Sequence, residues 1–182
     1  MILHVWTSLG EATDRAIAAK DGEDEHAADE ARADAERNGK AVCCFGAPGT
    51  GKTTATFRMI KHAIDKGGRI LLALPTAQLA ARMREKWGEY IEINTCAAAF
   101  GYLEHLAAGA MPSLGIYTLV LVDEISQLEG WQCDHILKLW RMAEHIPALA
   151  LVGDKGQMAG FGEVRPWHTT MWKASTWTRT LK

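Results

Sequence analysis

Short apolar runs alternate with helical patterns from residue 41 onward. Four of these runs predict strands: residues 41–45 (AVCCF), 69–74 (RILLAL), 117–122 (YTLVLV) and 148–152 (ALALV). None of the runs shows the strict alternation that is typical of a strand with one solvated face. We therefore expect strands that are covered on both faces, as in a parallel sheet.

Helical patterns separate the predicted strands. We expect helices after Gly51 and over residues 77–87, 96–108 and 131–145. The last of them should bury one stripe of side chains at helical spacing, made of Cys133, Ile136, Leu137, Trp140 and Ala143. Strands and helices in this order predict an α/β fold, a three-layer sandwich around a mainly parallel central sheet.

The N-terminal residues have a different composition. Residues 10–38 are rich in Ala, Asp, Glu and Arg, and Ile17 is their only large aliphatic residue. Residues 1–40 carry ten acidic and five basic side chains, whereas residues 41–182 carry twelve and fifteen. We expect an acidic, partly helical arm over 1–39, a folded domain over 40–165 that permits an anionic partner, and a Trp-rich tail over 166–182.

No apolar stretch approaches the roughly 18 residues of a membrane span. The first six residues lack the basic and apolar regions of a signal peptide. The four cysteines show no C-x-x-C spacing, which favours buried thiols in a reducing compartment over disulfides or zinc. We expect an intracellular protein, cytoplasmic or nuclear, that is not secreted and has no membrane partner.

The strongest chemical signal is the stretch GAPGTGKTT, residues 46–54. It follows one predicted strand and begins a predicted helix, which is the setting of a phosphate-binding loop. Its glycines let backbone N–H groups point inward, and the helix N-terminus adds a positive dipole. We expect Lys52 to neutralise the β and γ phosphates and the Thr53 hydroxyl to ligate Mg²⁺. The other predicted nucleotide-binding residues are Gly46, Ala47, Pro48, Gly49, Thr50, Gly51 and Thr54.

Two further polar groups follow predicted strands. Asp123 and Glu124 end the run YTLVLVDE, where Asp123 would hold the Mg²⁺ shell and Glu124 would orient or deprotonate the attacking water. Gln157 ends LVGDKGQ after the last strand. Because the carboxyl ends of parallel strands open onto one crevice, we expect the phosphate-binding loop, the acidic pair and Gln157 to line the same site. Gln157 is therefore a candidate sensor of the γ-phosphate.

Four segments occur in the order GAPGTGKT, LPTAQLAARMRE, VLVDEISQL and LVGDKGQ. They resemble motifs I, Ia, II and III of superfamily 1 helicases, with the greatest similarity to the RecD-like branch, which moves 5′ to 3′ on DNA. INTCAAAFGY resembles the segment that precedes motif II, with Thr95 retained. The resemblance implies a RecA-like P-loop NTPase domain that uses ATP and Mg²⁺ and places Lys52, Asp123, Glu124 and Gln157 at the catalytic site.

The same resemblance implies contacts with the nucleic-acid backbone at Pro75, Thr76 and Thr95. Thr76 is equally suited to cap the helix after Pro75. Arg82 and Arg84 could add phosphate contacts or simply form a solvated helix face. The three C-terminal tryptophans at 167, 172 and 177 are candidates for base stacking, but their spacing favours packing against a missing neighbour.

The sequence departs from the helicase pattern at three places. No Gln precedes position 78, so the glutamine that usually reads adenine has no counterpart. Met158-Ala159-Gly160-Phe161 stands where the family usually has Leu-Pro-Pro. Nothing after Gln157 resembles motifs IV to VI of the second RecA-like domain. We expect the chain to be the first half of a longer protein or the product of a truncated gene.

The expected function is ATP binding and hydrolysis as the N-terminal motor domain of a superfamily 1 helicase on single-stranded nucleic acid, with DNA favoured and RNA possible. The missing second RecA-like domain is a further expected partner. Three alternatives stay open at this point: an AAA-type ATPase that remodels proteins, a viral-type RNA helicase domain, and an orphan nucleotide-binding module.

Overall fold

A computed structural model describes residues 41–102, 113–157, 165–170 and 176–181, the last of these as backbone only. Six strands form one sheet in the order β3-β2-β4-β5-β1-β6, and every neighbouring pair is parallel. The strands are β1 (Ala41–Gly46), β2 (Ile70–Leu74), β3 (Glu92–Thr95), β4 (Leu119–Val122), β5 (Ala148–Gly153) and β6 (Thr176–Leu181). The mainly parallel α/β sheet that the sequence predicts is confirmed.

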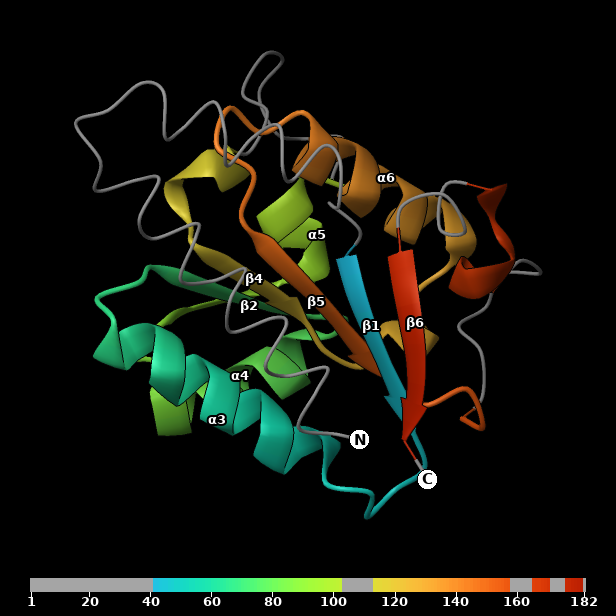
Figure 1. Ribbon diagram of the computed structural model, residues 1–182, viewed down its shortest axis with the longest axis horizontal. Coiled ribbons are helices and arrows are strands. Elements are labelled where there is room, and N and C mark those ends of the chain that lie inside the picture. Colours follow the sequence, from blue (N-terminus) through green and yellow to red (C-terminus); the bar gives the residue numbers. More distant parts are fainter. Residues whose placement is uncertain (1–40, 103–112, 158–164, 171–175, 182) are drawn as a thin grey trace.

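Helices cover both faces of this sheet (Figure 1). On one side lie α3 (Lys52–Asp65) and α4 (Ala77–Trp87), and on the other lie α5 (Cys96–Phe100) and α6 (Gly130–Arg141). Three short 3-10 helices complete the described chain: η1 (Leu114–Ile116), η2 (Ile125–Gln127) and η3 (Pro166–His168). The three-layer arrangement follows from the sequence pattern, since strands buried on both faces need two helical layers.

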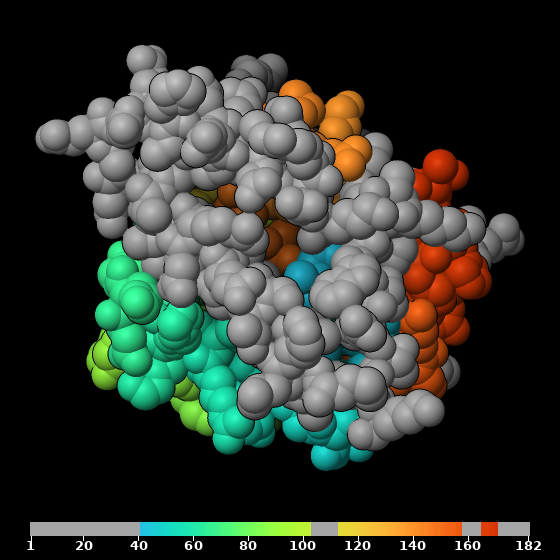
Figure 2. Space-filling view, in the orientation of Figure 1, coloured from blue at the N-terminus to red at the C-terminus, as the bar shows by residue number. Residues whose placement is uncertain are grey.

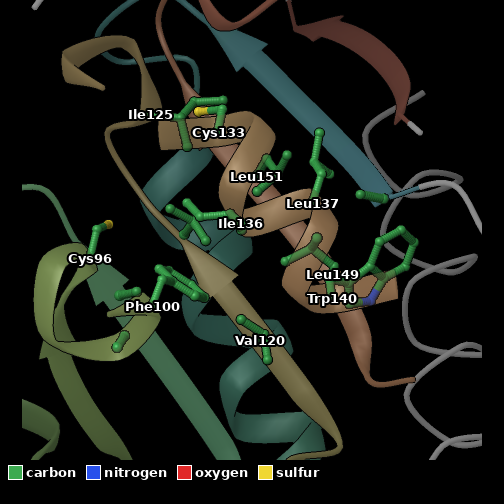
Figure 3. Close-up of a cluster of buried hydrophobic side chains, with 14 of the residues drawn as sticks. Cys96, Phe100, Val120, Ile125, Cys133, Ile136, Leu137, Trp140, Leu149 and Leu151 are labelled. Carbon is green, nitrogen blue, oxygen red and sulfur yellow. The ribbon is translucent and has the colours of Figure 1, made fainter. Parts of the chain in front are cut away.

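Alternate side chains of β1, β2, β4 and β5 lie in two cores, one on each face of the sheet, and Cys44 and Val152 form a small separate cluster. Cys43, Val120 and Leu151 lie on the α5/α6 side, whereas Leu72 and Leu121 lie on the α3/α4 side. Figure 3 shows the first core, where residues of α6 meet those of β4, β5 and α5. The predicted stripe of α6 is confirmed: Cys133, Ile136, Leu137 and Trp140 are buried, and Ala143 is partly buried against the same cluster.

Two helices end earlier than predicted, and one strand has no predicted counterpart; one of the helices is α6, which spans Gly130–Arg141 and not 131–145. The helix that starts at Cys96 ends at Phe100, because Gly101 adopts a left-handed conformation (φ 70°) that closes the last turn. Its predicted continuation over residues 103–108 lies outside the described residues. Strand β3 has no counterpart among the predicted strands, because it is a four-residue edge strand with one buried side chain, Ile93.

The sheet continues beyond residue 165. Strand β6 pairs with β1 along its whole length, from Ala41 opposite Thr176 to Gly46 opposite Leu181. The proposed arm over 1–39 lies outside the described residues, and the division at 165 and 166 stays a prediction. The four cysteines are all buried. Among the described helices, none is long and apolar enough to cross a membrane.

Candidate active site

The loop after β1 has the shape of an anion-binding turn. Gly49 and Gly51 adopt left-handed backbone conformations, with φ of 80° and 84°. A Cβ atom added to either would meet no atom within 4 Å, so it is the backbone conformation and not lack of space that favours glycine. The loop is exposed from Ala47 to Gly49, and its region at the start of α3 lies at the surface in cyan in Figure 2.

The N-terminus of α3 is free to receive an anion. Gly51 is the N-cap and supplies no side-chain hydrogen bond, and the first turn holds no acidic residue. The first helical hydrogen bond runs from Ala55 N to Gly51 O at 2.9 Å, which leaves the preceding N–H groups for an external acceptor. Thr53 and Thr54 lie exposed in this turn, as a phosphate-binding helix requires.

Lys52 folds back over its own loop. Its ammonium group donates hydrogen bonds to the carbonyl oxygens of Gly46 and Ala47, the latter at 2.9 Å. Thr50 Oγ1 donates to the same Ala47 carbonyl at 2.9 Å. The positive charge therefore sits in the loop, where phosphates would replace carbonyl oxygens as its acceptors. Lys52 also lowers the pKa of Cys44 against the larger effect of burial, which raises it to about 11.

The acidic pair, Asp123 and Glu124, directly follows β4 and forms a tight turn. Glu124 has a left-handed backbone (φ 55°), which is uncommon for a residue with a side chain. The Glu124 N–H donates to Asp123 Oδ1 at 2.8 Å, and Asp123 N donates to Ala73 O at 3.1 Å. Burial raises the pKa of the Asp123 carboxyl to about 6, aided by the charge of Glu124, while that backbone N–H and Lys52 lower it. Lys52 and Asp123 therefore lie close enough to interact electrostatically.

The acidic pair fits a divalent cation. Asp123 is half-buried, and one carboxylate oxygen of Glu124 is buried without a hydrogen-bond partner among the described residues. Both features cost free energy that a hard cation and its waters would offset. Asp123 and the exposed Thr53 hydroxyl supply the hard oxygen atoms that Mg²⁺ prefers, and a bound Mg²⁺ would neutralise phosphate charge there.

Strand β5 brings the loop that carries Gln157 to the same end of the sheet, because β5 lies between β1 and β4. Its end pairs Gly153 with Phe45 on one side, directly before the phosphate-binding loop, and Leu151 with Val122 on the other, directly before the acidic pair. The loop over residues 154–157 therefore emerges between the two other groups. The convergence that the sequence predicts at one sheet edge is present.

Close packing explains the residues of this loop. A Cβ atom added to Gly153 would lie 2.8 Å from Ile125 Cγ1 and 3.3 Å from Ser126 N, so only glycine lets β5 pass η2 so closely. Asp154 N donates to Ser126 Oγ at 3.2 Å, and Asp154 Oδ1 accepts from Gly156 N at 2.8 Å. Gln157 N donates to Asp154 O at 3.2 Å. The buried acid thus shapes the turn that carries Gln157.

The predicted nucleic-acid residues lie at the same sheet edge. Thr76 is the N-cap of α4, and its hydroxyl accepts from Leu79 N at 3.3 Å. Thr95 is the N-cap of α5, and its hydroxyl accepts from Ala98 N at 3.1 Å. Each hydroxyl also has one proton to donate. Pro75 is half-buried at the start of the turn before Thr76.

One expectation for surface residues stays open and one needs correction. Arg84, a candidate for a phosphate contact or a solvated helix face, is exposed, and its Nε donates to Ile93 O at 2.9 Å and its Nη2 to Asn94 Oδ1 at 3.4 Å, which fastens α4 to the edge strand β3. Trp167 was expected to pack on a missing neighbour, but it packs on this chain's own core, with its ring 5.2 Å from that of Phe45. Trp172 lies outside the described residues, and only the backbone of Trp177 is described.

Several residues of the site have no counterpart among the predicted ones. Ser126, Lys155 and Arg165 contact the loop over residues 154–157 or the end of β1. Their contacts depend on β5 lying beside β1 and on the return of the chain at η3. A local motif carries no signal for either arrangement.

Comparisons with known proteins agree with this geometry. The profile of the AAA_19 family, described as an AAA domain, matches residues 29–163, which is more than half of the chain. No curated protein matches the sequence significantly.

Several solved structures share the fold. One is a Pif1 helicase from Candida albicans (20% identity, TM-score 0.56), which matches 81% of this chain and 37% of that one. Another is Pif1 from Bacteroides sp in complex with ADP-AlF4 (17% identity, TM-score 0.58; 84% and 40%). A third is Bacteroides Pif1 bound to ssDNA (18% identity, TM-score 0.54; 80% and 39%). The chain thus spans about two-fifths of the length of these solved chains, and the likeness establishes the fold alone.

Proposed function

The chain belongs to the AAA_19 family of AAA domains, and on that premise we propose that it binds and hydrolyses Mg-ATP as the N-terminal motor domain of a superfamily 1 helicase. The nucleotide would sit on the phosphate-binding loop, with Lys52 on its phosphates. Thr53 and Asp123 would hold Mg²⁺, and Glu124 would orient the attacking water. The solved Pif1 in complex with ADP-AlF4, which shares this fold, supports a nucleotide as the proposed ligand.

One observation carries the helicase part of the proposal. Strand β5 lies between the strand of the phosphate-binding loop and the strand of the acidic pair, and Gln157 follows it. An amide at this place can bond the γ-phosphate and also move with a neighbouring domain. An AAA-type remodelling ATPase would usually carry Asn at the end of this strand, whereas this chain has Gly153 and Asp154.

Single-stranded DNA is the proposed partner, with RNA as the alternative. The caps Thr76 and Thr95 offer hydroxyl protons and helix N-termini, which are groups that hold a phosphate backbone without reading bases. Solved Pif1 structures bound to ssDNA and to forked dsDNA support this choice. Membership of the RecD-like branch and an intracellular location stay predictions.

A second RecA-like domain is the other proposed partner. The chain spans only about two-fifths of the length of the solved helicases. An arginine from a second domain accelerates related phosphoryl transfers by about 10³ to 10⁵. The chain should therefore bind Mg-ATP well and turn it over slowly.

Calorimetric titration of the chain with Mg-ATP tests the nucleotide part of the proposal. We expect measurable binding that Lys52→Ala removes, because the only ammonium group in the loop is lost. Lys66→Ala, at the opposite end of α3, is the matched control and should bind like the wild type. Equal binding by both variants would contradict the proposed phosphate site.

Hydrolysis assays with single strands test the motor part. The chain alone should hydrolyse ATP slowly with or without single-stranded DNA. In a chain extended by a second RecA-like domain, single-stranded DNA should stimulate ATP hydrolysis. Fast, DNA-stimulated hydrolysis by the 182-residue chain would refute the need for a second domain.

A further inference from the structure

An aromatic contact joins the end of β1 to the 3-10 helix η3. The rings of Phe45 and Trp167 meet edge to face, with centroids 5.2 Å apart and planes at 81°. Phe45 is buried and directly precedes Gly46, the first residue of the phosphate-binding loop. Trp167 therefore lies beside the base of that loop.

Two cations connect this aromatic pair to the loop of Gln157. Lys155 Nζ lies 4.5 Å from the ring centroid of Phe45 and 5.8 Å from that of Trp167. Arg165 Cζ lies 5.5 Å from the ring centroid of Trp167, and Arg165 Nη1 donates to Gln157 O at 3.3 Å. Because cation–π attraction is stronger where water is excluded, a half-buried Trp167 orients both cations.

The helix η3 is itself anchored on the sheet's helical layer. Thr169 Oγ1 donates to Asp134 Oδ1 on α6 at 2.6 Å, and the same hydroxyl oxygen lies 3.1 Å from Pro166 O. The segment thus cannot shift without disturbing α6. This segment supports one side of the loop over residues 154–157, while Ser126 contacts the start of the same loop.

We propose that Trp167, with Arg165, is a positioning residue that holds Gln157 in place relative to the phosphate-binding loop. Trp167 fixes the Arg165 guanidinium, which in turn holds the backbone of Gln157. The contact of Trp167 with Phe45 sets the distance between Gln157 and the phosphate-binding loop. This inference rests on the proposed role of Gln157 as a sensor of the γ-phosphate, and assigns the sensing geometry to side chains outside the four motifs.

The test compares two nucleotides that differ by the γ-phosphate. Dissociation constants are measured by calorimetry for Mg-ADP and for a non-hydrolysable Mg-ATP analogue, using the 182-residue chain. Gln157→Ala should weaken the analogue about fivefold, the effect of one hydrogen bond of about 1 kcal/mol, and leave Mg-ADP unchanged. Trp167→Ala should reproduce this selective loss, and Trp167→Phe, which keeps an aromatic face for Arg165, should restore most of the affinity.

Controls separate positioning from folding. Trp131→Ala removes another tryptophan, one that is 55% exposed and contacts Tyr102 on α5's side of the molecule, and should change neither constant. If Trp167→Ala fails to fold, Arg165→Gln keeps the aromatic pair and should show the same selective loss. A rise in both dissociation constants together would indicate general damage and would overturn the positioning role.

The outcomes also separate this inference from the proposed function. If Gln157→Ala weakens the analogue and neither Trp167→Ala nor Arg165→Gln does, the positioning role is wrong and the sensor role stands. If Gln157→Ala has no effect, the sensor role is wrong and the positioning role falls with it. If the wild-type chain binds neither nucleotide, the proposed function itself fails.

Discussion

Replacing Asp123 with Asn should make the chain more stable while it removes Mg-nucleotide binding. Burial, aided by the charge of Glu124, raises the pKa of the Asp123 carboxyl from 3.8 to about 6. The Glu124 N–H and the Lys52 ammonium act in the opposite direction but do not compensate. The folded chain therefore carries an ionised carboxylate at neutral pH at a cost in stability.

The pKa shift gives the sign and size of this cost. Because folded Asp123 binds its proton more tightly than unfolded Asp123, the free energy of unfolding falls as pH rises from about 4 to about 6 and stays lower above it. The raised pKa of Asp123 lowers the free energy of unfolding by about 3 kcal/mol at pH 8 and by about 1 kcal/mol at pH 4.5. Asn accepts the Glu124 N–H more weakly, which offsets about 1 kcal/mol. The expected gain is about 2 kcal/mol at pH 8 and near zero at pH 4.5.

Urea denaturation at the two pH values measures this difference, without Mg²⁺ or nucleotide. A gain of about 2 kcal/mol corresponds to a rise of about 4 to 8 °C in Tm for a chain of this size. Asp65→Asn is the control, because that carboxylate is exposed, pairs with Lys61 at 3.3 Å, and should change stability by less than about 0.5 kcal/mol. The reasoning would be refuted if Asp123→Asn were no more stable than the wild type at pH 8, or if it were stabilised equally at both pH values. Added Mg-ATP should stabilise the wild type and not Asp123→Asn.

Two further substitutions test the local structure. Gly51→Ala should destabilise the fold by about 1 to 2 kcal/mol in urea denaturation, because the backbone is left-handed there while the space around it is open; Gly51→Asn should cost less, and equal stability of all three would contradict the assigned strain. Arg84→Ala should cost about 1 kcal/mol and speed hydrogen exchange of the β3 amides, since its bond to Ile93 O is lost. Arg82→Ala, on the exposed side of the same helix, should leave both measurements unchanged.

The central strands and their helices could be predicted because burial on both faces produces uninterrupted apolar runs. The run at 119–122 and the stripe of α6 are such cases, and both are buried as expected. Strand β3 escapes this reasoning, because Ile93 is its only buried residue and four residues are too few for a period. The early end of α5 could have been read from Gly101, a residue type that is typical of a helix C-terminus.

The convergence of the phosphate loop, the acidic pair and Gln157 could also be predicted, because parallel strands end at one edge. What the sequence could not give is which side chains touch there. Arg84 bonds a strand nine residues further along, and Arg165 bonds Gln157 only after the chain has returned to β1. Such contacts depend on strand order, which is set by packing of the whole sheet and leaves no periodic pattern in the sequence.

Strand order also explains why LVGDKGQ has its particular residues. The end of β5 passes between β1 and η2, so Gly153 must lack a Cβ atom that would press on Ile125. The next residue, Asp154, is fixed by Ser126 on one side and turns the backbone through its bond to Gly156 N. The start of this loop therefore contacts η2, which follows the acidic pair, and Lys155 of the loop contacts Phe45 and Trp167 beside the phosphate-binding loop. We infer that Gln157 can respond to both halves of a nucleotide site because its loop is held from both sides.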